Sequence, residues 1–303
     1  MKVFVTGSSG YVGGTVAGAL LAAGHRVCGL VRSEERAAQV RARGIEPAIG
    51  ALADHDLLAR MAREADAVVN AANADDRGAA EAMLDAMKGT GKPFVHTSGS
   101  GIVADAAGGE PTDAVYEDDT PVHPLPARAA RVALNAFIRS AAGRGVRISI
   151  VAPSMIYGRG TGVNRDSIQI PKLIAAARKL GAAKYVGRGG NVWSNVHVED
   201  LAELYLAALD RAPAGAFCYA ENGENSMREI AAAISRMLGF GGHTAPMSIA
   251  EAVAEYGEAM TTYSFGSNSR VRAVRARREL GWSPRRPALL DDIERGSYAE
   301  PAR

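Results

Sequence analysis

The chain has 303 residues, of which 47% are hydrophobic and 22% are charged, and this composition is ordinary for a soluble globular protein. Its 35 basic and 33 acidic residues leave a net charge of +2, too small to predict binding to nucleic acid or to an anionic membrane surface. Two cysteines and short apolar runs argue against a disulfide framework, a metal site and a membrane span, and they favour a reducing cytoplasm.

The first half of the chain alternates strand patterns with helix patterns. Strands are expected at 2–6, 26–32, 45–50, 66–72, 93–98 and 146–153, and each is a nearly continuous apolar run. Helices are expected between them, one ending at residue 23 and others at 33–44, 54–64, 75–90 and 126–142. Apolar strands separated by helices predict an α/β fold, a Rossmann-type doubly wound parallel sheet covered on both faces.

The regular alternation stops after residue 153. Helices are expected near 166–180, 198–209, 226–239 and 287–296, with short strands near 184–187 and 215–219. We therefore predict a dinucleotide-binding Rossmann domain at 1–153 and a smaller mixed α/β lobe at 154–303, not strictly contiguous. The smaller lobe should close over the carboxyl edge of the sheet, where ligands of open α/β folds bind.

The segment TGSSGYVGG places Gly7, Gly10 and Gly13 between the first strand and the first helix. Gly7 permits a tight turn, Gly10 lets the backbone approach a pyrophosphate, and Gly13 lets the helix pack closely on the strand. The unpaired N–H groups and the positive end of the helix dipole also favour phosphate. This context predicts a dinucleotide site. Its expected contacts are Thr6, Gly7, Ser9, Gly10, Tyr11, Val12, Gly13, Leu52, Ala71, Ala72, Arg131 and Pro153.

The end of the second strand bears on the choice between NAD and NADP. An NAD site usually places an acid about 20 residues beyond the glycines, to bind the ribose hydroxyls. Here Arg32 stands at that spacing and Ser33 follows it. Because a guanidinium binds a 2′-phosphate through paired hydrogen bonds, we predict NADP(H), with Arg32 and Ser33 in the site. The alternative is NAD(H), with Glu34 on the ribose and Arg32 only capping the sheet edge.

Five segments together resemble the extended and atypical short-chain dehydrogenases/reductases, also known as NAD-dependent epimerase/dehydratases. TGSSGYVGG is similar to the TGxxGxxG motif of that family, and FVHTSGSG (94–101) to its serine-bearing fifth strand. IVAPSMIYGRG (150–160) is similar to the RPxxxYG segment, with Ala152 in place of the usual arginine. NVHVEDLAELYLAAL (195–209) and LGWSP (280–284) complete the resemblance, which implies a nicotinamide cofactor and a substrate pocket beside it.

The resemblance also implies a catalytic serine or threonine, a tyrosine, and a lysine four residues after the tyrosine. In this chain the tyrosine position falls on Ala127, the lysine position on Arg131, and the serine position on Gly99, between Ser98 and Ser100. The segment 126–142 contains no tyrosine or lysine, so a shift of the alignment within it does not restore the pair. Arg131 stays protonated at neutral pH and cannot act as a general acid, although it can hold a ribose or an anionic substrate.

Other side chains are candidates for the chemistry and for substrate contacts. The candidate catalytic residues are Ser98, Ser100, Arg131 and Tyr157. The candidate substrate-binding residues are Tyr116, Asn164, Arg165, Trp193 and His197. Structural roles remain open for three of these residues: Arg131 as a surface charge, Trp193 as packing between lobes, and His197 as a tie between loops.

These features predict an NADPH-dependent oxidoreductase that reduces a small carbonyl, enone or imine with nonstandard proton delivery. Such reductions can rely on positioning and electrostatics when no strong acid is present. Two alternatives stay open: a cofactor-binding sensor without turnover, and a cofactor-dependent epimerase or dehydratase. The expected partners are a small-molecule substrate and a second copy of the chain, paired through the helices at 75–90 and 126–142.

Overall fold

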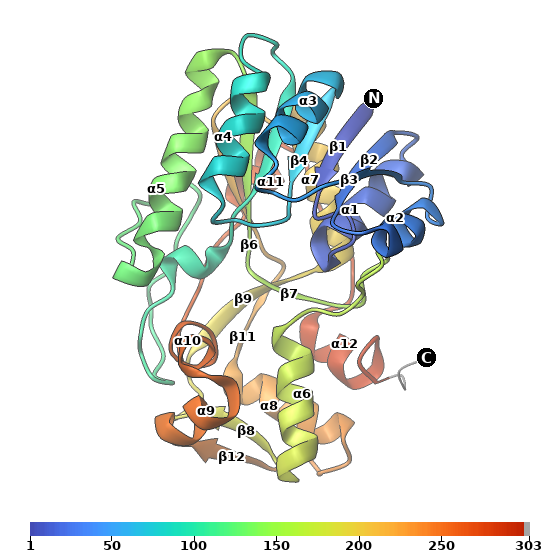
Figure 1. Ribbon diagram of the computed structural model, residues 1–303. Helices are drawn as coiled ribbons and strands as arrows, with labels where there is room; N and C mark the ends of the chain where they lie inside the picture. The colour runs from blue at the N-terminus through green and yellow to red at the C-terminus, as the bar shows by residue number, and fades with distance from the viewer. Residues whose placement is uncertain (300–303) are drawn as a thin grey trace.

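A computed structural model describes residues 1–299, and its main feature is a sheet of seven parallel strands (Figure 1). These strands are β1 (Lys2–Thr6), β2 (Arg26–Val31), β3 (Glu46–Ile49), β4 (Ala67–Asn70), β5 (Pro93–Thr97), β6 (Arg147–Pro153) and β10 (Ala216–Ala220). Their order is β10-β6-β5-β4-β1-β2-β3. Strands β1 to β3 extend the sheet to one side and β4 to β6 extend it to the other, so the strand order reverses between β1 and β4. In such folds a ligand crevice lies outside the carboxyl ends of the strands at this switch point.

Helices cover both faces of this sheet, as the alternating pattern predicted. They are α1 (Tyr11–Ala22), α2 (Glu34–Arg41), α3 (His55–Glu64), α4 (Arg77–Ala86), α5 (Pro126–Ser140) and α7 (Val198–Arg211). The helices α1, α2 and α7 share one apolar cluster with the sheet, and α3, α4 and α5 share the other. Polar side chains begin several of them: Ser33, Asp54 and Asp76 each accept a hydrogen bond from a backbone N–H of the following turn. The seven strands and these helices form the large lobe.

The chain returns to the large lobe after residue 153. The strand expected near 215–219 is β10, and it pairs with β6 at the edge of the large sheet. The helix α7 packs against α1, and a short helix, α11 (Val274–Arg278), packs against β10. The chain therefore crosses between the lobes several times.

The small lobe contains two small sheets. One has the order β11 (Glu224–Ser226), β9 (Val192–His197), β7 (Met155–Tyr157), and the other pairs β12 (Thr244–Met247) with β8 (Ala183–Val186). Its helices are α6 (Gln169–Leu180), α8 (Met227–Met237), α9 (Ile249–Tyr256), α10 (Glu258–Met260) and α12 (Leu289–Arg295). After α10 comes a turn of π-helix at Thr261–Phe265. These elements surround an apolar core of their own.

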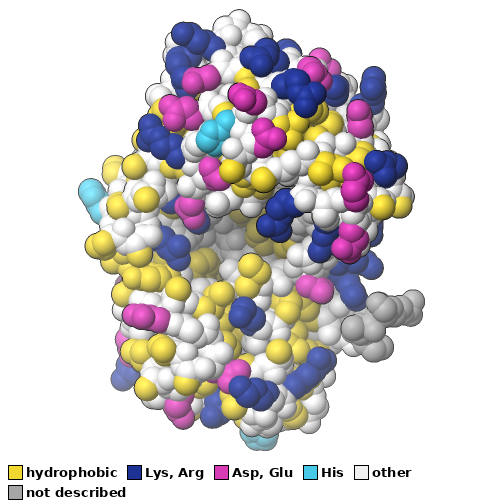
Figure 2. Space-filling view, in the orientation of Figure 1, with side chains coloured by type: hydrophobic (Ala, Val, Ile, Leu, Met, Phe, Trp, Pro, Cys, Tyr) yellow, Lys and Arg dark blue, Asp and Glu magenta, His cyan; other side chains and the backbone are white. Residues whose placement is uncertain are grey.

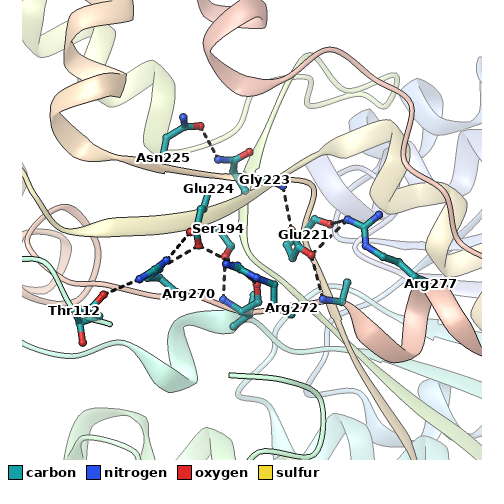
Figure 3. Close-up of polar contacts among 12 residues, drawn as sticks. Thr112, Ser194, Glu221, Gly223, Glu224, Asn225, Arg270, Arg272 and Arg277 are labelled. Atoms are coloured by element: carbon teal, nitrogen blue, oxygen red, sulfur yellow. Dashed lines mark hydrogen bonds and ion pairs between the residues drawn. The ribbon is translucent and has the colours of Figure 1, made fainter. Parts of the chain in front are cut away.

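A long connection, 98–125, joins β5 to α5 and runs along the small lobe. It contains a short 3-10 helix at Ser100–Val103, and a second one, Ala141–Arg144, follows α5. Tyr116 in this connection pairs with Val271, and Arg270 donates a hydrogen bond to the Thr112 carbonyl (Figure 3). Within residues 1–299, no helix combines the length and apolar character needed to cross a membrane.

Candidate functional site

A cavity of about 940 Å³ lies at the carboxyl edge of the large sheet, lined by both lobes. Figure 2 shows the hollow between the upper and lower halves of the molecule, with lysine or arginine side chains on both sides of it. Most of the predicted site residues line this cavity. They are Gly7, Ser9, Gly10, Tyr11, Val12, Gly13, Arg32, Leu52, Ala71, Ala72, Ser98, Ser100, Arg131, Pro153, Asn164 and Trp193.

The glycine-rich turn has the close approaches that the sequence predicted. Gly7 has a φ of +73°, and its carbonyl oxygen accepts a hydrogen bond from the Gly10 N–H at 2.8 Å. A Cβ atom at Gly13 would lie 2.4 Å from the Gly7 carbonyl oxygen, which is too close for any other residue. Gly10 is the N-cap of α1 and provides no side-chain cap, so backbone N–H groups at the helix start are free of a side-chain partner. This turn fits the pyrophosphate of a dinucleotide.

Thr6 supports the turn from beneath and does not line the cavity, contrary to the prediction of a direct contact. Its buried hydroxyl donates to Asn70 Oδ1 at 2.7 Å and accepts from the N–H groups of Ala71 and Ala72 at 3.0 and 3.2 Å. These bonds hold the end of β4 against the end of β1. Thr6 therefore shapes the wall that Ala71 and Ala72 present.

The turn is also tied to the start of the small lobe. The Tyr11 hydroxyl donates to the Gly158 carbonyl at 2.7 Å, and burial raises the pKa of Tyr11 far above its ordinary value. The Asn164 N–H donates to the Ser9 carbonyl at 3.2 Å. Tyr11 and Asn164 thus line the cavity while joining the lobes. Because its proton is engaged and its phenolate disfavoured, Tyr11 is poorly suited to proton transfer.

Two arginines line the cavity near β2. Arg32 was predicted there, and Arg36, one helical turn later on α2, was missed although its spacing from Arg32 offered a signal. Both side chains are exposed. Ser33 is not among the residues that line the cavity, and its side chain caps α2 by accepting a hydrogen bond from the Arg36 N–H at 3.3 Å. Glu34 lies outside the cavity lining, in the first turn of α2.

The two serines near the missing tyrosine position are buried and hydrogen bonded. Asn135 Nδ2 donates to Ser98 Oγ at 2.9 Å, which leaves the Ser98 proton available for another acceptor. Ser269 Oγ lies 2.8 Å from Ser100 Oγ and also bonds the Ser100 carbonyl. Ser98 is thus the better oriented donor, and the sequence offered no signal for Asn135.

Arg131 is held in the cavity wall by Asp75, a residue that sequence reasoning missed. Arg131 Nε and Nη2 donate to the two Asp75 carboxylate oxygens at 2.7 and 2.5 Å. The hydrogen bond from Arg131 lowers the pKa of Asp75. A Cβ atom at Gly99 would lie 3.7 Å from Arg131 Nη1, so the third nitrogen points toward the serine segment. Arg131 is therefore an ordered, neutralised cation next to Gly99.

Tyr157 and His197 were predicted in the site and lie outside the cavity. Tyr157 is completely buried, its hydroxyl donates to the Pro287 carbonyl at 2.7 Å, and burial raises its pKa. His197 Nδ1 accepts from the Glu199 N–H at 3.2 Å and caps α7, while its ring packs edge-on against Tyr157 at 5.4 Å. Burial also lowers the pKa of His197. These groups hold the small lobe together, so the catalytic assignment of Tyr157 was wrong.

Tyr116 and Arg165 also lie outside the cavity. The backbone of Tyr116 pairs with that of Arg270 and Arg272, and Arg165 Nε donates to the Gly160 carbonyl at 3.0 Å. Trp193 lines the cavity, but its Nε1 donates to the Ser267 carbonyl at 2.7 Å. Trp193 therefore packs within the small lobe and also faces the cavity, and its contact with substrate stays a prediction.

The small lobe adds cavity residues that carried no sequence signal. They include Met260, Tyr263 and Ser264 from the π-turn and its neighbours, together with Asp166 and Gln169 near the start of α6. Arg128 joins them from the first turn of α5. In the described part of the chain, no cluster of three or more His, Cys, Asp or Glu side chains has the geometry of a metal site.

Relatives of known sequence match nearly the whole chain. An uncharacterised protein of Schizosaccharomyces pombe is 32% identical and covers 98% of this chain and 100% of its own length. Oxidase ucsJ of an Acremonium species is 31% identical, covering 97% of this chain and 95% of its own length. A 4-hydroxy-2-methyl-3-oxo-4-farnesyl-3,4-dihydroquinoline-1-oxide ketoreductase of Stigmatella aurantiaca is 29% identical, covering 94% and 92%.

Solved structures share the same fold. UDP-glucose 4-epimerase of Thermotoga maritima, with UDP-glucose, superposes with a TM-score of 0.76 at 15% identity and covers 97% of this chain and 96% of its own. dTDP-glucose 4,6-dehydratase of Bacillus anthracis, in complex with NAD, has a TM-score of 0.75 at 17% identity, covering 94% and 92%.

The family model for NAD-dependent epimerases and dehydratases matches residues 3–217, which include the glycine-rich turn, the serine segment and α5. The matched range thus contains most of the cavity wall contributed by the large lobe. With this match and the relatives above, the chain belongs to the NAD-dependent epimerase/dehydratase family, and its relatives support an NAD(P)-dependent oxidoreductase.

Proposed function

We propose that this protein is an NADP(H)-dependent reductase of a small carbonyl, enone or imine. The observation that carries the proposal is that one cavity joins the glycine-rich turn and Arg32 and Arg36 at one end with Ser98 and Arg131 at the other. The ketoreductase relative supports the same reaction class. When bound, the reduced cofactor supplies a hydride, and the residues of this chain must bind it, orient the substrate and manage the proton.

The choice of NADP(H) rests on two exposed guanidinium groups in the cavity near β2. A 2′-phosphate carries about two negative charges, and arginine forms paired, charge-assisted hydrogen bonds with such groups. A ribose without phosphate would need an acceptor for its hydroxyls instead. Glu34, the nearest acid that follows Arg32, lies outside the cavity lining.

The Ser98 hydroxyl is the group that donates to the substrate oxygen or nitrogen. Asn135 fills its acceptor side, so the Ser98 proton is directed to another partner. Ala127 provides no acid, and the proton that the substrate atom gains passes through Ser98 and is replaced from water. The ion pair with Asp75 fixes the Arg131 guanidinium, so that its Nη1, which points toward Gly99, can donate a hydrogen bond to the substrate atom as negative charge develops there. The Trp193 ring supplies an apolar wall to the same cavity.

Titration with NADPH and NADH tests the cofactor assignment. Arg32→Ala and Arg36→Ala should each weaken NADPH binding by roughly 10- to 100-fold, because each removes a charge-assisted contact, while NADH binding stays within about twofold. Arg41→Ala, on the same helix as Arg36 and outside the cavity, is the matched control. Equal losses for both cofactors would refute the 2′-phosphate assignment.

Turnover is tested by following reduced nicotinamide absorbance with a panel of carbonyls, enones and cyclic imines. Wild-type protein should oxidise NADPH with at least one class. Ser98→Ala should lower kcat by roughly 10- to 100-fold and leave NADPH affinity unchanged. Tight NADP(H) binding without turnover on any compound would instead support a cofactor sensor.

A further inference from the structure

Arg128 lies at the end of the cavity where the family tyrosine would stand, and its charge is less fully balanced than that of Arg131. It lies in the first turn of α5, directly after Ala127, and it lines the cavity. Its Nε is buried and has no hydrogen-bond partner within residues 1–299. No carboxylate of that part of the chain forms an ion pair with it, whereas its neighbour Arg131 is neutralised by Asp75.

The Arg128 guanidinium is held in place by the small lobe. It lies over the ring of Tyr263 at 5.1 Å from the ring centre, and Tyr263 belongs to the π-turn that lines the opposite wall. A contact of this kind attracts the guanidinium to the ring face and leaves its N–H groups able to donate to another acceptor. Burial, followed by the charge of Arg131, lowers the pKa of Arg128 although the charge of Asp75 opposes this, so a further anion at this point would relieve an electrostatic cost.

The position of Arg128 separates it from the phosphates of a bound dinucleotide. The pyrophosphate site is at the start of α1, which follows β1, and the two arginines of the 2′-phosphate site follow β2. The helix α5 follows β5 and packs against β6. In the order β5-β4-β1-β2, three steps of about 4.8 Å place β5 roughly 14 Å from β2. Arg128 and Arg32 therefore come from different positions along the carboxyl edge of the sheet, and we assign them to different anions.

Asp166, the acidic residue of the cavity lining, does not neutralise Arg128. Its charge raises the pKa of Tyr11 and Tyr298, which places it near the start of α1 and the end of the described chain. Arg128 lies instead beside Tyr263, Arg131 and Asp75, and the Asp75 carboxylate is already bound by two hydrogen bonds from Arg131. Within residues 1–299 the cavity thus has a positive group without a direct ion pair, next to the apolar walls of Met260, Tyr263 and Trp193.

We propose that Arg128 binds a carboxylate of the substrate, so that the reduced compound is a small organic acid with an apolar or aromatic body. The proposal rests on the proposed function, since it names the substrate class of the same cavity. A guanidinium held beside an aromatic ring can bind a carboxylate through two parallel hydrogen bonds. The apolar body of the acid then packs on the aromatic and methionine side chains nearby.

Isothermal titration calorimetry with phenylacetate and phenylacetamide tests this assignment without requiring turnover. The two probes share shape and differ in charge. The carboxylate should bind wild-type protein more tightly than the amide, with and without saturating NADP⁺. Arg128→Gln should weaken the carboxylate by roughly 10- to 100-fold and leave the amide unchanged, and Arg128→Lys should retain part of the affinity. Arg139→Gln, on the same helix and outside the cavity, should bind both probes as wild type does.

Several results would overturn the proposal. The proposal is refuted if wild-type protein binds phenylacetate no more tightly than phenylacetamide. It is also refuted if phenylacetate shows no detectable binding. An Arg128→Gln variant that loses NADPH affinity as strongly as carboxylate affinity would assign Arg128 to the cofactor. The cofactor proposal is tested separately. Arg32→Ala should weaken NADPH binding and leave the binding of phenylacetate to cofactor-free protein unchanged, so either proposal can fail without the other. Tyr263→Leu, which removes the stacked ring, should weaken the carboxylate less than Arg128→Gln does.

Discussion

Replacing Glu224 with glutamine tests the ion-pair cluster that ties the small lobe to the connection 98–125 (Figure 3). The Glu224 carboxylate accepts hydrogen bonds from Arg270 at 2.7 and 3.1 Å and from Arg272 at 3.0 Å. Arg270 in turn donates to the Thr112 carbonyl at 2.8 Å. Because the segment 266–273 directly follows the π-turn that carries Tyr263, the cluster also anchors one wall of the cavity.

The size of the effect follows from the pKa of Glu224. Its hydrogen bond with Arg270, followed by the contact with Arg272, lowers this pKa from 4.5 to about 2. Without screening, such a difference corresponds to about 3 kcal/mol of stability at neutral pH. Since 24% of the Glu224 side chain is exposed, solvent reduces the contribution to about 1–2 kcal/mol. The folded pKa lies below the unfolded one, so this stability is present above about pH 4.5 and is lost as the pH falls toward 2.

Urea denaturation of wild-type and Glu224→Gln protein at several pH values between 7 and 3 measures this contribution. The variant should be less stable by about 1–2 kcal/mol at pH 7, and the difference should shrink below about pH 4.5. Glu81→Gln removes an exposed partner of Arg77 at 3.8 Å and should change stability by less than ~0.5 kcal/mol. A stability difference that does not depend on pH, or no difference at pH 7, would refute the electrostatic reasoning.

Two further predictions concern the turn and the assembly. Gly13→Ala should destabilise the protein by about 1–3 kcal/mol and abolish dinucleotide binding, because its Cβ atom would lie 2.4 Å from the Gly7 carbonyl oxygen. Gly143→Ala, where no atom lies within 4 Å of the new Cβ, should change neither the stability nor dinucleotide binding. Thermal unfolding measures the stability of both variants, and titration with NADPH measures their cofactor binding. We also propose a homodimer through the adjacent helices α4 and α5, for which light scattering should give twice the 31.6 kDa chain mass, and a mass of one chain would refute it.

The fold of the large lobe could be predicted because its signals are local. Strands buried on both faces are continuous apolar runs, and their helices carry caps such as Ser33 within a few residues of the helix start. The short strands β7, β9 and β11 were missed, since three to six residues with polar side chains such as Ser194 and Asn195 show no clear period. The pairing of β10 with β6 is a contact between distant segments, and no local pattern indicates it.

The sequence alone determined the alternating α/β architecture, the glycine-rich turn at Gly7–Gly13 and the loss of the tyrosine at Ala127. Each of these depends on residues close together in the chain, where backbone geometry and side-chain size act directly. Only the tertiary structure decided that Tyr157 is a buried structural group and that Arg128 lies over Tyr263 with its Nε unbonded by any described residue. The roles of these two residues depend on burial and on contacts with residues distant in the sequence. The fold brings those residues together, and their spacing in the sequence does not indicate the contact.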